Sequence, residues 1–229
     1  GLRTLTVLQD AVEMIEHDCG KKLDLDTIDY NDRRVMEAIG TGKNEGVFQL
    51  ESGGFKTFMK ELKPESLEDI IAGISLYRPG PMDFIPKYLK GKNDPASITY
   101  TCPQLEHILS PTYGCIVYQE QVIRIFQELG GFSLGQADMV RRAMSKKKAK
   151  EIEKERQAFV YGDKERGITG CVANGIEEAT AQAIYDEIFD FANYAFNKAH
   201  AVSYAVVAYQ TAYFKCHYTK EYMAALLTS

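Results

Sequence analysis

A run of basic residues between Gln136 and Lys150 is the segment of this sequence with the clearest capacity for chemistry. Its last ten residues hold six cationic side chains and no acidic one, in a chain of formal net charge −5: Arg141, Arg142, Lys146, Lys147, Lys148 and Lys150. Like charges one helical turn apart, as at Arg142 and Lys146, destabilise a helix by about 0.2–0.5 kcal/mol per pair. The cluster therefore indicates a site for an anion, and a solvated basic face is the alternative.

A second group of candidate binding residues lies towards the C-terminal end. Tyr194, Lys198 and His200, within YAFNKAH, offer a stacking ring, a cation and a hydrogen-bond donor, a combination that suits a nucleotide. The alternative is that Tyr194 and His200 are half-buried residues at the junction of two helices. Gln119 and Gln121 share one predicted helix but point in different directions, so at most one of them faces a ligand.

Catalytic groups are harder to find in this sequence. His17, His107 and His217 lie on or at the end of predicted helices, where histidines are mostly solvated or capping residues. Asp24 and Asp26 belong to a predicted loop and not to the strand that a pair of metal-binding aspartates would need. The sequence therefore predicts neither a nucleophile with its base nor a catalytic metal site.

The elements that position these residues are predicted to be helices. Ser133 followed by Gln136 is a capping-box pattern, which begins the helix that carries Arg141 and Arg142. Apolar spacing predicts further helices at 5–20, 31–39, 55–62, 66–77, 103–109, 118–129, 176–191 and 200–217. The prolines of Arg78-Pro79-Gly80-Pro81 predict a rigid corner that fixes Arg78. The fold class is thus mainly α, with many helices and few or no strands.

Composition and charge limit the remaining possibilities. The 229 residues can form one domain or two closely packed ones, with GKNDPAS (91–97) as the best candidate for an internal boundary. Residues 46–54 are predicted to be extended, and residues 149–161 to form an exposed arm. Five cysteines without CxxC spacing indicate reduced cytoplasmic thiols, and no apolar stretch is long enough to cross a membrane. The opening GLRTLTV lacks a start methionine, so we expect a fragment of a longer protein.

Six motifs, taken in order, resemble one family: GLRTLTV, GVFQLES, LYRPGPM, TYGCIVYQEQV, ADMVRRAMSKK and FNKAHAVSYAVVAYQTAY. Over essentially the whole chain the sequence is similar to the fingers region of the bacterial replicative polymerases of family C, the DNA polymerase III alpha subunits. The resemblance implies a helical lead-in from the palm at 1–40 and a fingers domain at 41–229. It implies a DNA-directed DNA polymerase, a nucleotidyltransferase, as the parent protein. The palm aspartates that hold Mg²⁺ would then lie outside this fragment, which would be inactive alone.

The resemblance also implies roles for single residues. Arg141 and Arg142 match the arginine pair expected to meet the triphosphate of the incoming dNTP, with Lys147 as a weaker candidate for the same anion. The residues expected to line the nucleotide and template pocket are Arg78, Gln119, Tyr194, Lys198 and His200. Primed template DNA and, for the parent, a sliding clamp are the implied partners, in the bacterial cytoplasm at the nucleoid. The alternative function is a non-catalytic helical module that docks an acidic partner protein.

Overall fold

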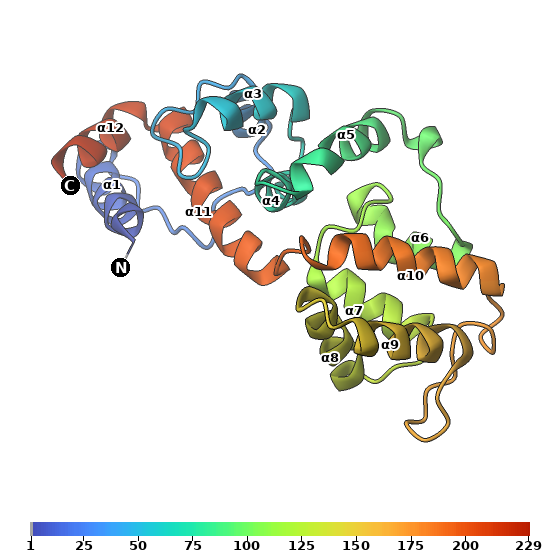
Figure 1. Cartoon of the computed structure of the whole chain (residues 1–229). Coiled ribbons are helices and arrows are strands. Elements are labelled where there is room, and N and C mark those ends of the chain that lie inside the picture. Colours follow the sequence, from blue (N-terminus) through green and yellow to red (C-terminus); the bar gives the residue numbers. More distant parts are fainter. Residues whose placement is uncertain (1) are drawn as a thin grey trace. The chain divides into compact units, whose positions relative to one another are not determined.

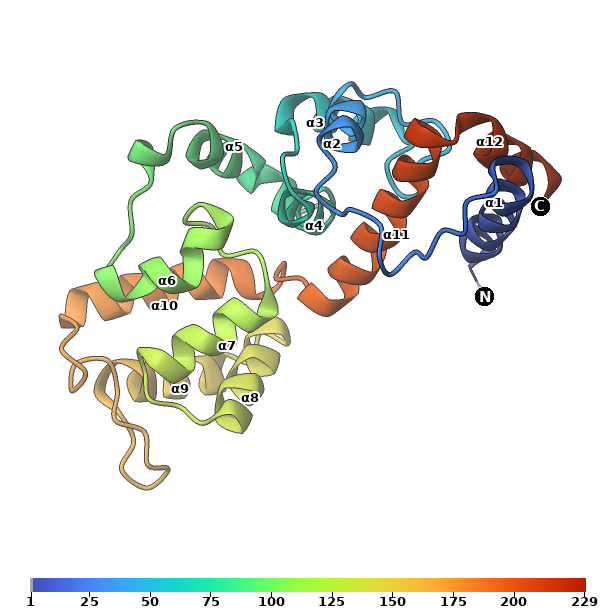
Figure 2. The ribbon, with the colours of Figure 1, turned by 180° about the vertical axis from the view of Figure 1, so that it is seen from behind.

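The computed structural model describes residues 2–229, and this part of the chain is built almost entirely from helices (Figure 1 and Figure 2). Gly1, where the predicted lead-in segment begins, lies outside the described residues. Across residues 2–229 there is no β-strand, and the bridges Tyr118–Phe196 and Asp163–Ile168 are isolated pairs. The prediction of a mainly α fold is confirmed.

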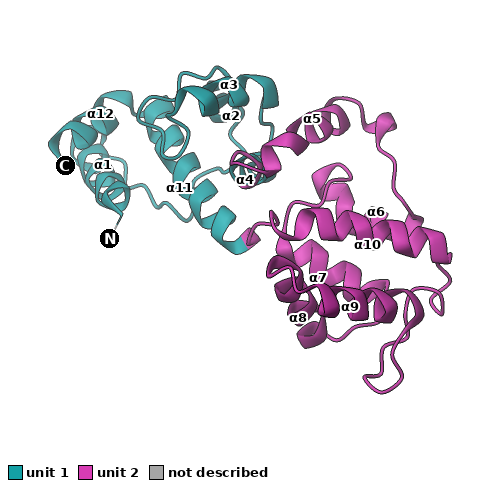
Figure 3. Cartoon of the chain, in the orientation of Figure 1, with its two compact units in different colours: residues 1–74, 199–229 teal, residues 75–198 magenta. Residues whose placement is uncertain are grey.

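The chain divides into two compact units (Figure 3). The first comprises residues 1–74 and 199–229, and the second comprises residues 75–198. The segment 91–97, predicted as a possible internal boundary, lies inside the second unit. In the part of the chain that the structure describes, no helix has the length and apolar character required to span a membrane.

The first unit is formed by α1 (Arg3–Cys19), α2 (Arg33–Gly40), α3 (Gly53–Leu62), most of α4 (Leu67–Leu76), α11 (Lys198–His217) and α12 (Thr219–Thr228). Helix α1 ends as predicted at Gly20, whose φ of 65° closes the last turn. It lies beside α12, and the two share a core with the end of α11 that includes Leu8, Ile15, Phe214 and Tyr222 (Figure 1).

The second unit contains α5 (Ile85–Asn93), α6 (Glu106–Leu109), α7 (Gln119–Glu128), α8 (Leu134–Ser145), α9 (Ala149–Tyr161) and α10 (Glu178–Ala192). Short 3₁₀ turns lie at Pro81–Phe84, Pro95–Ser97, Pro103–Leu105 and Ser110–Thr112. Helices α7 to α10 enclose one core. At its centre the ring of Phe126 lies 5.2 Å from that of Phe159 and 6.2 Å from that of Tyr185. This core fixes the helices that carry the predicted binding residues.

Two segments of the second unit differ from their predicted form. The linker predicted at 91–97 is instead the end of α5 and a 3₁₀ turn. Gly91 is buried there, and a Cβ atom on it would lie 2.8 Å from Tyr113 Cβ, so the glycine permits close packing and not flexibility. The exposed arm predicted at 149–161 is a helix whose last turn enters the core through Phe159, which is fully buried.

The segment predicted to be extended at 46–54 also has a different form. Residues 45–49 make successive turns, and α3 begins at Gly53. Gly46 and Gln49 have φ values of 76° and 66°, which a strand does not allow. The segment GVFQL is therefore a compact turn that buries Val47 and Leu50.

All five cysteines carry free thiols, as predicted. Cys102, Cys115 and Cys171 are buried, whereas Cys19 is exposed and Cys216 is half-buried. Burial raises the pKa of the Cys115 thiol to about 11 and that of Cys171 to about 12, because a thiolate is poorly solvated in an apolar core. The core thiols are therefore held in the unreactive protonated form.

We expect Cys19 to be the first thiol of the native protein to react with a chromogenic disulfide reagent. At about pH 8, a buried thiol with a pKa near 11 is ionised in fewer than about one molecule in a hundred, and the thiolate is the reactive form. All five thiols should react in guanidinium chloride. Rapid modification of Cys115 or Cys171 in the folded protein, located by peptide mass mapping, would contradict this burial.

Candidate functional site

The segment between α10 and α11 is held against the start of α7 by backbone pairing within the second unit. Phe196 N donates a hydrogen bond to Val117 O (3.0 Å), and Gln119 N donates one to Phe196 O (2.9 Å). The two bonds make Tyr118 and Phe196 a parallel bridge. Backbone groups outside helices need such partners, so the pairing gives this non-helical junction a defined course. It brings Gln119 beside the segment that carries Tyr194 and Lys198.

Gln121 holds Val117 and Tyr118, the residues that pair with Phe196, in place. Its side-chain oxygen accepts hydrogen bonds from Val117 N (2.9 Å) and Tyr118 N (3.0 Å). Its amide nitrogen donates to Ile108 O (3.3 Å) and to Thr112 Oγ1 (2.8 Å). Gln121 is buried and Gln119 is half-buried, so of the two glutamines only Gln119 is placed to face a ligand. The spacing of the two glutamines does not predict the anchoring role of Gln121.

Lys198, the first residue of α11, is oriented by residues at the start of α7. Its backbone N–H donates to Glu120 Oε2 (3.2 Å), a favourable position for a carboxylate at a helix N-terminus. Its Nζ lies 5.3 Å from the centre of the Tyr118 ring, close enough for a cation–π attraction of about 0.5–1 kcal/mol. The backbone and the side chain of Lys198 are thus both held by residues at or next to the Tyr118–Phe196 pairing.

Arg78 joins the same junction from a distant part of the sequence. Its Nε donates to Ser75 O (2.9 Å), and its Nη2 donates to Tyr194 O. Its guanidinium carbon lies 4.6 Å from the centre of the Phe196 ring. Burial lowers the pKa of the Arg78 guanidinium, although an arginine remains charged in proteins. Helix α4 has ended at Leu76, so Arg78 stands on the non-helical corner that the prolines predict.

Gly80, in the same corner, lies directly against Tyr194. A Cβ atom on Gly80 would lie 2.4 Å from Tyr194 Cε1, and the glycine has a φ of 102° that other residues rarely adopt. Tyr194 is nevertheless 38 % exposed. The ring is therefore supported by the Gly80 backbone and remains partly open to solvent.

The arginine pair is carried by α8, which begins with the predicted capping box. Gln136 N donates to Ser133 Oγ (3.2 Å), and Ser133 N donates to Gln136 Oε1 (2.9 Å). Asp138 contacts both arginines, because its Oδ1 accepts from Arg141 Nε (3.1 Å) and Nη2 (2.8 Å) and its Oδ2 lies 3.0 Å from Arg142 Nη2. A count of charges that begins at Arg141 does not include this carboxylate. Asp138 precedes Arg141 and Arg142 by three and four residues, and this spacing predicts contacts on one helical face.

The three lysines after the arginine pair do not continue the helix. Helix α8 ends at Ser145, and Lys146–Lys148 form the turn before α9, with a φ of 52° at Lys147. Lys146 caps the helix end, and its backbone N–H donates to Arg142 O (3.2 Å), so it still lies one helical turn after Arg142 as the spacing predicts. Arg142 lies in the last turn, where the helix dipole favours a cation.

One hydrogen bond links the end of α8 to the junction. Ser145 Oγ donates to Ala192 O (3.2 Å) and also lies 3.2 Å from Arg141 O. Ala192 is the last residue of α10 and precedes Tyr194 by two positions. Four of the predicted pocket residues and the arginine pair therefore belong to neighbouring parts of the second unit: Arg78, Gln119, Tyr194, Lys198, Arg141 and Arg142.

His200 is the predicted pocket residue that belongs to the first unit. It lies in the first turn of α11 and is exposed. Its ring meets the edge of Tyr204 at a centroid distance of 4.5 Å, and Tyr204 in turn stacks on Phe48 at 5.7 Å. His200 is thus positioned by an aromatic neighbour one turn along the same helix.

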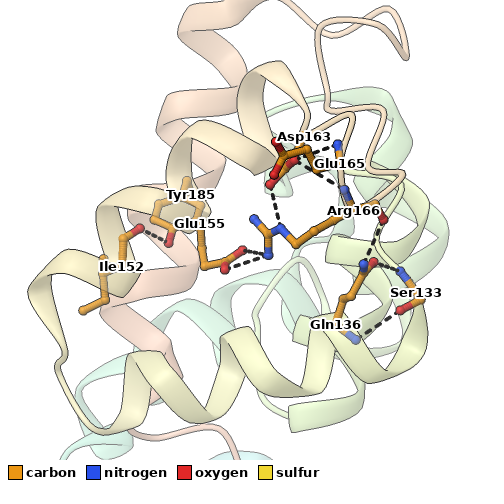
Figure 4. A network of polar contacts seen from close by, with 8 residues as sticks. All are labelled: Ser133, Gln136, Ile152, Glu155, Asp163, Glu165, Arg166 and Tyr185. Carbon is orange, nitrogen blue, oxygen red and sulfur yellow. Dashed lines mark hydrogen bonds and ion pairs between the residues drawn. The ribbon is translucent and has the colours of Figure 1, made fainter.

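A polar network holds the start of α8 in place (Figure 4). Gln136 Nε2 donates to Arg166 O (3.0 Å), and Arg166 Nε donates to Asp163 Oδ2 (2.7 Å). Arg166 Nη1 also donates to both carboxylate oxygens of Glu155 on α9 (2.9 and 3.1 Å). The Arg166 side chain, by its hydrogen bond, lowers the pKa of the Asp163 carboxyl. The loop between α9 and α10 therefore ties α8 to α9.

The remaining histidines have acidic partners, in agreement with surface or capping roles. His17 Nδ1 lies 2.8 Å from Asp18 Oδ1, His107 contacts Glu128, and His217 Nε2 lies 2.8 Å from Asp32 Oδ2. Among residues 2–229, no three His, Cys, Asp or Glu side chains are grouped so that they could hold a metal ion.

Comparisons with known proteins agree with one another. The family model for the bacterial DNA polymerase III alpha subunit finger domain matches residues 4–167, which is more than half of the chain. DNA polymerase III subunit alpha of Halalkalibacterium halodurans is 48% identical over 229 residues, that of Thermus aquaticus 46% over 233 and that of Bacillus subtilis 44% over 229. Each alignment covers 100% of this chain and 20%, 18% and 20% of the respective relative. The chain thus spans about a fifth of their length.

We expect Asp163→Asn to lower the free energy of unfolding at neutral pH by weakening the network around Arg166. The pKa of Asp163 is lowered in the folded state, so its contribution is present above the unfolded value near 3.8 and is lost as the pH falls through the folded value. Urea titrations at about pH 7 and about pH 3 should show a difference from the parent that shrinks on acidification. Asp190→Asn, at an exposed aspartate of α10, is the control. Equal midpoints for parent and Asp163→Asn at neutral pH would contradict the role of Asp163.

Proposed function

The chain belongs to the bacterial DNA polymerase III alpha subunit finger-domain family, and on this premise we propose that it binds the incoming dNTP and the template base during DNA synthesis. The parent protein is then a DNA-directed DNA polymerase. Residues 41–229 act as its fingers domain, and residues 1–40 form the lead-in from the palm. Primed template DNA is the second substrate, and the sliding clamp is a partner of the parent in the bacterial cytoplasm at the nucleoid.

The observation that carries this proposal is the arginine pair at the end of α8, anchored by Ser145 beside the junction that holds Tyr194 and Lys198. A guanidinium presents paired N–H donors that match phosphate oxygens, which a lysine cannot do. Phosphoryl transfer depends mainly on positioning and on stabilising charge. We assign Arg141 and Arg142 to the triphosphate, with Lys147 on the following turn as an auxiliary cation.

The junction supplies the other side of the proposed pocket. Tyr194 offers a ring that is supported by Gly80 and partly exposed, which suits contact with a base or sugar. Lys198 adds a cation whose position is set by Glu120 and Tyr118. Arg78 holds the Tyr194 segment, and Gln119 and His200 complete the residues that we assign to nucleotide and template contacts.

Mg²⁺ would supply charge neutralisation at the reacting phosphates in the complete enzyme. The donor set of residues 2–229 does not fit such a metal site, because no acidic or histidine cluster of the required size is present there. We therefore place the metal-binding aspartates of the palm outside this chain. The part played by this chain is to bind and orient the nucleotide.

We expect Arg141→Ala or Arg142→Ala, made in the full-length polymerase, to lower kcat/KM for dNTP by about tenfold to a hundredfold. Each change removes charge-assisted hydrogen bonds worth about 1.5–3 kcal/mol. Lysine at either position should restore part of the loss, since the charge returns without the paired donors. Lys150→Ala, at the end of the same basic run, is the control and should change little. Steady-state primer extension measures these constants.

The opposite pattern would identify a different role for the basic run. If all three alanine variants weakened primed DNA equally and left the KM for dNTP unchanged, the cluster would be a contact for the DNA backbone. If the chain is instead a module that docks an acidic partner protein, it should bind a nucleoside triphosphate no better than a monophosphate.

We also expect the isolated chain to incorporate no nucleotide into a primed template in the presence of Mg²⁺. The reason is that it lacks a metal-binding cluster within residues 2–229. Primer extension by the purified chain above a protein-free blank, repeated with a second independent preparation, would overturn the placement of the catalytic aspartates.

A further inference from the structure

One carboxylate contacts both members of the arginine pair. Asp138 Oδ1 accepts two hydrogen bonds from Arg141, at 3.1 and 2.8 Å, and Asp138 Oδ2 lies 3.0 Å from Arg142 Nη2. Each oxygen of the carboxylate therefore serves a different guanidinium. This arrangement bears directly on how two neighbouring arginines can act on one ligand.

Adjacent residues on a helix point in directions about 100° apart, so Arg141 and Arg142 do not converge by helical geometry alone. Asp138 lies three and four positions earlier, on the helical face between those two directions. Its carboxylate can therefore draw the two guanidiniums towards a common point. Without it, repulsion between the two cations would favour separation of the side chains.

The contact differs from an ordinary surface ion pair in its burial. The Arg141 side chain is 15% exposed and that of Asp138 is 30% exposed, whereas the Arg142 side chain is 68% exposed. Within residues 2–229, no carboxylate other than Asp138 pairs with either guanidinium. The half-buried Asp138–Arg141 pair is thus held in one position. From there the Asp138 carboxylate orients the Arg142 side chain, which stays exposed.

Asp138 leaves most of the donors of the pair unengaged. Each guanidinium has five N–H donors, and Asp138 engages Nε and Nη2 of Arg141 and Nη2 of Arg142. The remaining donors can receive phosphate oxygens while Asp138 stays in place. A long, flexible side chain that is ordered before binding loses less entropy when the ligand arrives.

We propose that Asp138 is a positioning residue that aims Arg141 and Arg142 at the triphosphate of the incoming nucleotide. This inference rests on the proposed function, because it assigns a means of orientation to the same site. Asp138 does not contact the nucleotide itself. It acts through the two guanidiniums.

The test compares Asp138→Ala with Asp138→Asn in the full-length polymerase. Both variants remove the negative charge, but asparagine keeps an acceptor oxygen for Arg141 while its amide nitrogen cannot accept from Arg142. We expect Asp138→Ala to raise the KM for dNTP about tenfold, since both arginines must then be ordered during binding. Asp138→Asn should raise it less, and kcat should stay within about twofold in both variants.

Two further readouts separate positioning from a general structural role. The melting temperature and the affinity for primed DNA should match those of the parent, and those of Glu153→Ala, which removes a carboxylate–arginine contact on α9. In a protein that already carries Arg142→Ala, adding Asp138→Ala should raise the KM for dNTP by less than it does in the parent. One of the two arginines that Asp138 orients is then absent. Asp138→Asn provides the measurement should the alanine variant fold poorly.

A lower KM in both neutral variants would overturn the proposal, since it would mean that Asp138 only repels the triphosphate. An unchanged KM in both, with Arg142→Ala raising KM, would overturn the role of Asp138 and leave the proposed function in place. If Arg142→Ala itself left KM unchanged, the proposed function and this inference would both fail.

Discussion

Two backbone hydrogen bonds, one donated and one accepted by Phe196, fix the non-helical junction of the second unit. They join the residues before α7 to the residues before α11, which are far apart in the sequence. Backbone groups of a non-helical segment need partners, and these two bonds supply them at Phe196. The cation–π contact of Lys198 with Tyr118 and the contacts of Arg78 with Tyr194 and Phe196 depend on the same alignment.

Helix ends and corners could be predicted from the sequence where the residues that define them are close together in the chain. The capping box at Ser133, the left-handed glycine after α1 and the proline corner after Leu76 each act over a few residues, and each is found where expected. Apolar spacing likewise located α10 and α11 to within a few residues. These signals describe a helix without its neighbours, so they establish the class of the fold and not its packing.

What escaped prediction depends on contacts between distant residues. The bonds from Ser145 to Ala192 and from Lys198 to Glu120 leave no trace in local composition. A glycine such as Gly91 is equally compatible with a flexible linker and with close packing, and only the presence of Tyr113 decides between them. Asp138 is a different case, because its contacts are local and a count of charges that began at Arg141 excluded it.

Gln121 shows how tolerance to sequence change is distributed in this unit. Its amide accepts two hydrogen bonds and donates two, all within a buried site. Glutamate has the same shape but would lose both donated bonds and carry a buried charge, and leucine would remove the acceptor that Val117 N and Tyr118 N share. Exposed residues such as Arg142 can be exchanged without loss of the fold. Substitution at Gln121 is therefore limited by its buried hydrogen bonds, and divergence among related chains should be slow at this inward-facing position.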